Sequence, residues 1–113
     1  MVLDDAVLNQ MSVVADGWGD SLQHGDMTLE DFYQSVNKVH RLHESAFRRM
    51  INSLGLHKNE RGYYGYADAL VVLTWMRRRD RFYSCKEFMR CAGADIHQRA
   101  KGIDFSRLVS YEG

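Results

Sequence analysis

Residues 67–79 read ADALVVLTWMRRR, and this stretch decides the fold. Its first two turns are almost wholly apolar, so a helix here must be buried on most of its sides. The β-branched side chains of Val71, Val72 and Thr74 would also suit a strand, but the length of the run and its lack of alternation favour a helix. We expect it to form the centre of the core and to end at the basic run Arg77–Arg81, whose positive charge suits a helix C-terminus.

A longer apolar pattern precedes this stretch. Its members recur at steps of three and four: Leu29, Phe32, Val36, Val39, His43, Ala46, Met50 and Leu54. Thr28 and Asp31 form an imperfect capping box before the pattern, and Gly55 supplies a left-handed stop after it. The spacing predicts one long helix of about 40 Å at 1.5 Å per residue. Such a helix is either the spine of the fold or half of a dimer interface, for which Val39, His43 and Met50 are the predicted contacts.

Two more regions have helical signals. An acidic first helix is predicted from Asp4 to Ala15. Gly17 and Gly19 weaken its continuation, but Trp18 and Leu22 fit the same apolar stripe, so the helix either stops there or bends and resumes.

The second region follows the basic run. Ser84 and Glu87 form a full capping box, and Tyr83 and Phe88 occupy the positions of a hydrophobic staple. This pattern predicts a short helix that ends before Gly93.

The chain has 113 residues, no proline and nine glycines that separate the apolar patterns. These features predict one all-α domain, residues 1–113, built as a compact bundle of about five helices with one long helix. Its many methionines and aromatic residues predict that some large apolar groups remain at the surface, and we expect a homodimer to cover them. No window is long and apolar enough to span a membrane, and the N-terminus lacks the basic region of a signal peptide. We therefore expect a soluble, cytoplasmic protein.

The charges are strongly segregated. Residues 1–31 carry seven acidic and no basic side chains, whereas residues 32–113 carry fifteen basic and eight acidic ones. Opposite fields of this size steer macromolecules together, so the sequence favours association with another macromolecule. The basic run Arg77–Arg81 could meet protein carboxylates or nucleic-acid phosphates, and the sequence leaves both open.

Three tyrosines lie in or directly after the longest irregular segment, residues 56–65: Tyr63, Tyr64 and Tyr66. Tyrosine gives a large contact area at low entropic cost, so these residues are the first predicted partner contacts. Trp18 and Leu22, beyond the acidic first helix, are the second. A purely structural alternative is that the tyrosines cap the core beneath Leu70 and Trp75.

Two groups of side chains resemble metal or catalytic sites. One is His40, His43 and Glu44, and the other is Cys85, Cys91 and His97. Neither has the spacing of a known zinc motif, and buried structural roles explain them better. No nucleophile elbow or phosphate-binding glycine loop is present. The sequence therefore predicts a protein that is not an enzyme and uses no metal or cofactor.

Residues 84–101 have the outline of a DNA-binding helix-turn-helix, with Gly93 at the turn and several polar or basic residues on the second helix: His97, Gln98, Arg99 and Lys101. The pattern places Met89 where a small residue should pack and Arg99 where an apolar one should. A DNA-binding regulator is therefore the alternative function.

The length and the three main helical tracts, Asp4–Asp16, Thr28–Leu54 and Ala67–Arg81, resemble those of the small quorum-sensing antiactivators of the QslA type. The resemblance covers the whole chain and rests on no short motif. It implies a homodimer that binds the ligand-binding domain of a LuxR-type transcription factor, such as LasR, and blocks its dimerisation and DNA binding. It assigns no binding residue.

Overall fold

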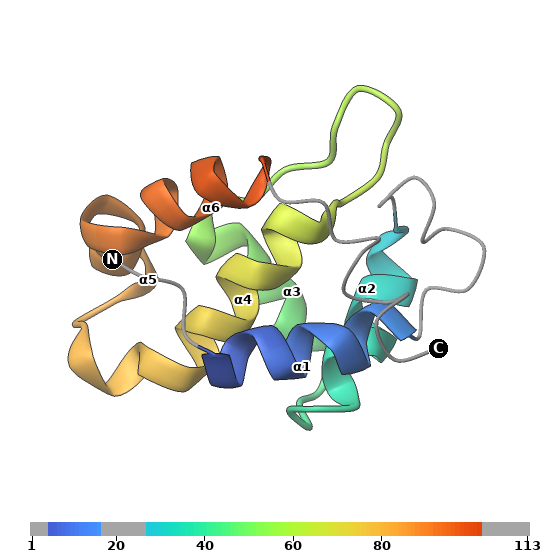
Figure 1. Ribbon diagram of the computed structural model, residues 1–113, viewed down its shortest axis with the longest axis horizontal. Helices are drawn as coiled ribbons and strands as arrows, with labels where there is room; N and C mark the ends of the chain where they lie inside the picture. Colours follow the sequence, from blue (N-terminus) through green and yellow to red (C-terminus); the bar gives the residue numbers. More distant parts are fainter. Residues whose placement is uncertain (1–4, 17–26, 103–113) are drawn as a thin grey trace.

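The computed structural model describes residues 5–16 and 27–102, and the predicted all-α class is confirmed in these ranges (Figure 1). The elements are α1 (Asp5–Asp16), α2 (Leu29–Asn37), α3 (Glu44–Leu54), α4 (Tyr66–Arg78), a 3-10 turn (Arg79–Arg81), α5 (Cys85–Phe88), a π-helical segment (Met89–Gly93) and α6 (Ala94–Ala100).

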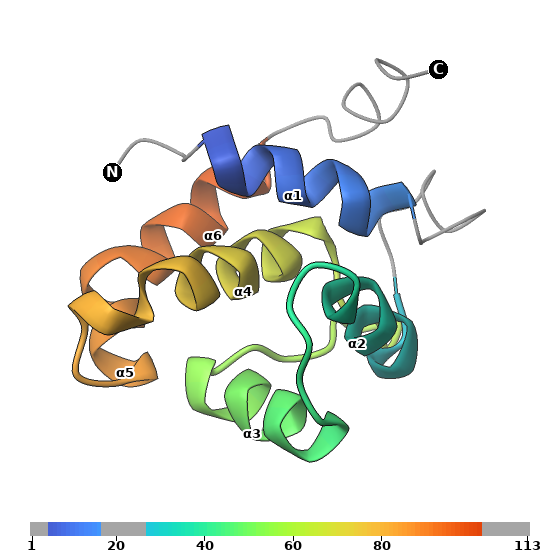
Figure 2. The same cartoon turned by 90° about the horizontal axis from the view of Figure 1, so that it is seen from below.

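Helix α4 is the centre of the core, as its sequence predicts. All five residues from Ala69 to Leu73 are fully buried, and the Thr74 hydroxyl donates a hydrogen bond of 2.8 Å to the carbonyl oxygen of Leu70. This bond satisfies a polar group inside an apolar core. Helix α4 packs against α1 and α6, and Figure 2 shows it between α1 on one side and α3 on the other.

The prediction of one long helix from Thr28 to Leu54 is wrong. Helix α2 ends at Asn37 and α3 begins at Glu44. Side chains satisfy the backbone of the intervening turn: Asn37 Oδ1 accepts the Leu42 N–H at 3.0 Å, and the Tyr33 hydroxyl donates to the Leu42 carbonyl at 2.8 Å. Asparagine competes with helical hydrogen bonding in this way, so it stops α2 although the apolar spacing continues.

Both ends of the α2–α3 pair have the predicted caps. Thr28 Oγ1 accepts the Asp31 N–H at 3.1 Å, and Gly55 has a positive φ of 73°. Just before α2, the backbone of Met27 exchanges two hydrogen bonds of 2.7 and 2.8 Å with that of Tyr64. This bridge fastens the start of α2 to the segment that leads into α4.

The C-terminal region is one continuous helical segment from Cys85 to Ala100, with the π-helical segment in the middle. The predicted Ser84 cap is confirmed, since Ser84 Oγ accepts the Glu87 N–H at 3.2 Å. The predicted turn at Gly93 is wrong, because Gly93 has helical angles of −63° and −41°. A Cβ atom there would collide with Met89 Sδ and lie 3.0 Å from the Phe88 ring, so this glycine is needed for close packing.

The predicted staple between Tyr83 and Phe88 is also wrong. The backbone of Phe82 is extended, so Phe82 and Tyr83 point to opposite sides. Phe82 packs edge-on against Phe88, with ring centroids 5.3 Å apart, whereas Tyr83 is 98% exposed. Phe82, one residue before the predicted Tyr83, therefore makes the contact with Phe88, and Tyr83 is exposed to solvent.

Candidate interaction surfaces

The three tyrosines predicted to bind a partner lie in different environments. Tyr63 is 38% exposed, and its N–H donates to Asn59 Oδ1 at 3.1 Å. Tyr66 is half-buried against the core, and burial raises its pKa to about 12. The Tyr63 side chain is therefore accessible to a partner, whereas the Tyr66 side chain is only partly accessible.

Tyr64 is a core residue, which corrects its prediction as a partner contact. Its side chain is 6% exposed and its ring centroid lies 5.4 Å from that of Phe32. Burial, and secondarily the nearby carboxylate of Asp68, raises the pKa of the Tyr64 hydroxyl. The structural alternative, that a tyrosine of this segment caps the core, applies to Tyr64.

The predicted dimer contacts do not form one stripe, because the turn after α2 separates them. Val39 and Met50 are half-buried against their own core, and His43 is exposed as the N-cap residue of α3. Trp18 and Leu22, the other predicted partner contacts, lie outside the described residues.

Asp68 and His97 form a pair that sequence reasoning missed. Asp68 Oδ2 accepts the Gly65 N–H at 2.9 Å and so caps α4, while Asp68 Oδ1 lies 2.9 Å from Nε2 of His97 on α6. Asp68 is buried, so this bond links the start of α4 to α6 in a place where water competes little. The spacing from Gly65 to Asp68 could have predicted the cap, but nothing in the sequence indicates the partner 29 positions away.

Within the described residues, no three histidine, cysteine, aspartate or glutamate side chains gather as a metal site. Cys85 and Cys91 are both free thiols, and burial raises the pKa of Cys85. His97 pairs with Asp68 and not with the thiols. The buried roles predicted for these groups are wrong for His43, Glu44 and Cys91, which are all exposed, whereas Cys85 is partly buried.

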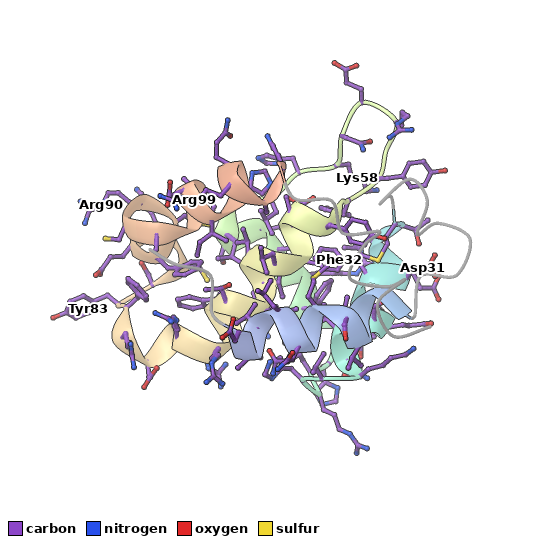
Figure 3. The ribbon with its side chains drawn as sticks, viewed as in Figure 1. Asp31, Phe32, Lys58, Tyr83, Arg90 and Arg99 are labelled. Carbon is purple, nitrogen blue, oxygen red and sulfur yellow. The ribbon has the colours of Figure 1, made fainter. Side chains whose placement is uncertain are left out.

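An exposed basic surface surrounds Tyr83 at one end of the molecule (Figure 3). We call it the Tyr83 surface and define it by five exposed side chains: Arg79, Arg81, Tyr83, Lys86 and Arg90. Residues 77–91 carry six basic and two acidic side chains. One of the two carboxylates, that of Glu87, accepts the Tyr83 N–H at 3.3 Å. The basic run seen in the sequence therefore lies next to an exposed aromatic side chain, Tyr83, which the staple pattern had predicted to pack against Phe88.

The helix-turn-helix predicted for residues 84–101 is not present. The backbone continues as a helix through Gly93, and the Ala94 N–H bonds to the Met89 carbonyl in the π-helical pattern. Arg99 does not face a partner helix but is exposed, with its Nε 3.0 Å from Asp95 Oδ2. The alternative function therefore has no support from this segment.

Comparisons with protein-family models, with curated proteins and with solved structures found no match. Among the described residues, no helix is long and apolar enough to cross a membrane.

Proposed function

We propose that this chain is a cytoplasmic, non-catalytic regulator that binds another protein through the Tyr83 surface. The observation that carries the proposal is the 98% exposure of Tyr83 among arginines and a lysine. Tyrosine and arginine dominate the binding energy of protein interfaces, because each covers a large area and also forms hydrogen bonds. An aromatic residue left in water at the centre of a basic surface is therefore a natural binding anchor.

The Tyr83 surface has the support that an anchor needs. Phe82 is partly buried and packs against Phe88, and Ser84 caps the following helix, so the residues on both sides of Tyr83 are held in place. Little backbone entropy is then lost on binding. Arginine guanidinium groups form paired hydrogen bonds with carboxylates, so the partner that fits is a protein with an acidic patch around an apolar pocket.

The resemblance to the QslA-type antiactivators suggests which partner this is. We propose that the chain binds the ligand-binding domain of a LuxR-type activator such as LasR and covers the surface through which that activator dimerises. An activator held as a monomer cannot place two DNA-binding domains on the two halves of a symmetric operator. Occlusion of this kind needs affinity and shape but no chemical step.

The test uses the purified LasR ligand-binding domain and isothermal titration calorimetry. We expect binding by the parent chain and a loss of about 1–3 kcal/mol for Tyr83→Ala, with Arg81→Ala also weakened. Val13→Ala is the matched control, because Val13 is 45% exposed on α1, outside the Tyr83 surface. If the domain is not bound, the partner is wrong. If it is bound equally well by Tyr83→Ala but poorly by Tyr63→Ala, the contact lies on the 56–65 segment.

A further inference from the structure

We propose that α3 and the turn before it form a binding surface for duplex DNA, a function separate from the protein binding proposed above. Helix α3 lies at the edge of the molecule, and in Figure 2 no other labelled element covers its outer side. Helix α3 has six exposed side chains, of which one, Glu44, is acidic. The other five are basic or uncharged, and we call them the α3 face: Ser45, Arg48, Arg49, Asn52 and Ser53. Their spacing of three, four, seven and eight places them on one side of the helix.

The α3 face has the chemistry that reads base edges. Arginine donates two hydrogen bonds to guanine, asparagine pairs with adenine, and serine contacts either base. The carboxylate of Glu44 is part of the same side of α3, and its Oε1 lies 3.4 Å from Arg48 Nη2. That ion pair is exposed and therefore weak, so it can exchange for a DNA contact at little cost.

A cleft of about 550 Å³ adjoins the start of α3. It is lined by Gln34, Asn37, Lys38, Arg41, Leu42 and His43, and so it holds two cations, an imidazole and two amides but no carboxylate. Contacts to the phosphate backbone come from such donors and fix the orientation of a protein on the duplex. The cleft is therefore placed to bind the backbone while the α3 face lies toward the bases.

The surface is held in position from beneath. The Tyr33 hydroxyl and the Asn37 side chain both bond to the backbone of Leu42 in the turn. Phe47, on the inner side of α3, packs against Phe32 and Tyr33 with centroid distances of 5.1 and 5.5 Å. A recognition helix needs this rigidity, because each base contact depends on a position fixed to about 0.5 Å.

Duplex DNA fits this surface better than an acidic protein does. The α3 face has no exposed aromatic or aliphatic side chain, whereas protein interfaces need an apolar centre. Protein–DNA interfaces are polar, wet and positively charged. Duplex RNA fits less well, because its deep, narrow major groove does not admit a helix. The turn, residues 38–43, is longer than the three or four residues of the usual helix-turn-helix, so the arrangement is a variant of that motif.

The experiment measures fluorescence anisotropy of a labelled 20-base-pair duplex of mixed sequence at several salt concentrations. We expect Arg41→Ala/Arg49→Ala to weaken binding at least tenfold and to make the salt dependence less steep by about 0.9 for each phosphate that the variant no longer neutralises. Arg81→Ala/Arg90→Ala is the matched control, since it removes the same charge from the Tyr83 surface. It should bind DNA like the parent chain.

Poly-glutamate, added as a competitor in the same assay, represents an acidic protein partner. Three results would overturn the proposal: no binding of the duplex by the parent chain in 50 mM salt, equal losses in the two double variants, or an Arg41→Ala/Arg49→Ala variant that loses binding to poly-glutamate but binds the duplex like the parent chain. Circular dichroism verifies the fold of each variant. If Arg41→Ala/Arg49→Ala does not fold, Asn52→Ala decides, because it keeps the charge and should lose discrimination between duplexes of different sequence. Unchanged discrimination would then refute the assignment of the α3 face. The LasR titration is independent of all these results.

Discussion

Phe47 lies edge-on against Phe32, with ring centroids 5.1 Å apart and an interplanar angle of 86°. In one uninterrupted helix these two residues would stand about 22 Å apart at 1.5 Å per residue. The turn between α2 and α3 is therefore required for this part of the core. It also turns the outer side of α3 into a separate surface, which a long straight helix would not have.

Replacing Ser84 tests the start of the helix that follows the basic run. Ser84→Ala should cost about 1 kcal/mol, because the Glu87 N–H loses its acceptor. In a domain of this size the melting temperature should fall by several degrees. Tyr83→Ala should leave the melting temperature unchanged, because Tyr83 makes little contact with the core. The reverse order in thermal denaturation would mean that Tyr83 is a staple after all.

Gly93 should be intolerant of a side chain. Alanine normally stabilises a helix interior by up to about 1 kcal/mol over glycine. Here the added Cβ meets Met89 Sδ and the Phe88 ring, so Gly93→Ala should destabilise the protein by about 1–3 kcal/mol in urea unfolding. Gly102→Ala is the control, because the nearest atom to its Cβ would be the Arg99 oxygen at 3.6 Å. A Gly93→Ala variant as stable as the parent would show that Met89 and Phe88 repack freely.

His40 should make stability depend on pH. Burial, and secondarily the positive charge of Arg79, lowers its pKa from 6.5. The folded state then binds a proton less tightly than the unfolded state, so the free energy of unfolding should fall as the pH drops below about 6.5 and level off below the folded-state pKa. Glutamine does not titrate in this range, so the His40→Gln variant lacks this pH-dependent part of the free energy of unfolding.

The measurement is urea unfolding at pH 7.5 and pH 5.5 for the parent chain and His40→Gln. The parent should lose more stability over this range than the variant does. Equal losses would place the titrating group elsewhere.

Homodimerisation remains a prediction, but the proposed contacts change. Val39 and Met50 pack against their own core, so Val39→Asp or Met50→Asp should lower the melting temperature and not simply dissociate a dimer. Sedimentation velocity at micromolar concentration measures the state of the parent chain. A monomer would remove the prediction, whereas a folded Met50→Asp monomer beside a dimeric parent would restore Met50 as an interface residue.

Local chemistry by itself determined much of this protein. The uninterrupted apolar run predicted the buried α4, and Thr28, Gly55 and Ser84 marked helix ends correctly, because capping depends on residues only a few positions apart. The segregation of charge also predicted a basic surface, because charged residues can be counted along the sequence without knowledge of the fold.

Tertiary structure decided the rest. The apolar spacing from Leu29 to Leu54 is the same for one helix as for two, and only the packing of Phe47 on Phe32 and the bonds to Leu42 select two. Tyr64 is buried because Phe32 lies beside its ring, and Tyr83 is exposed because Phe82 makes the contact with Phe88. Contacts between residues distant in sequence determine such choices, and local patterns do not contain them.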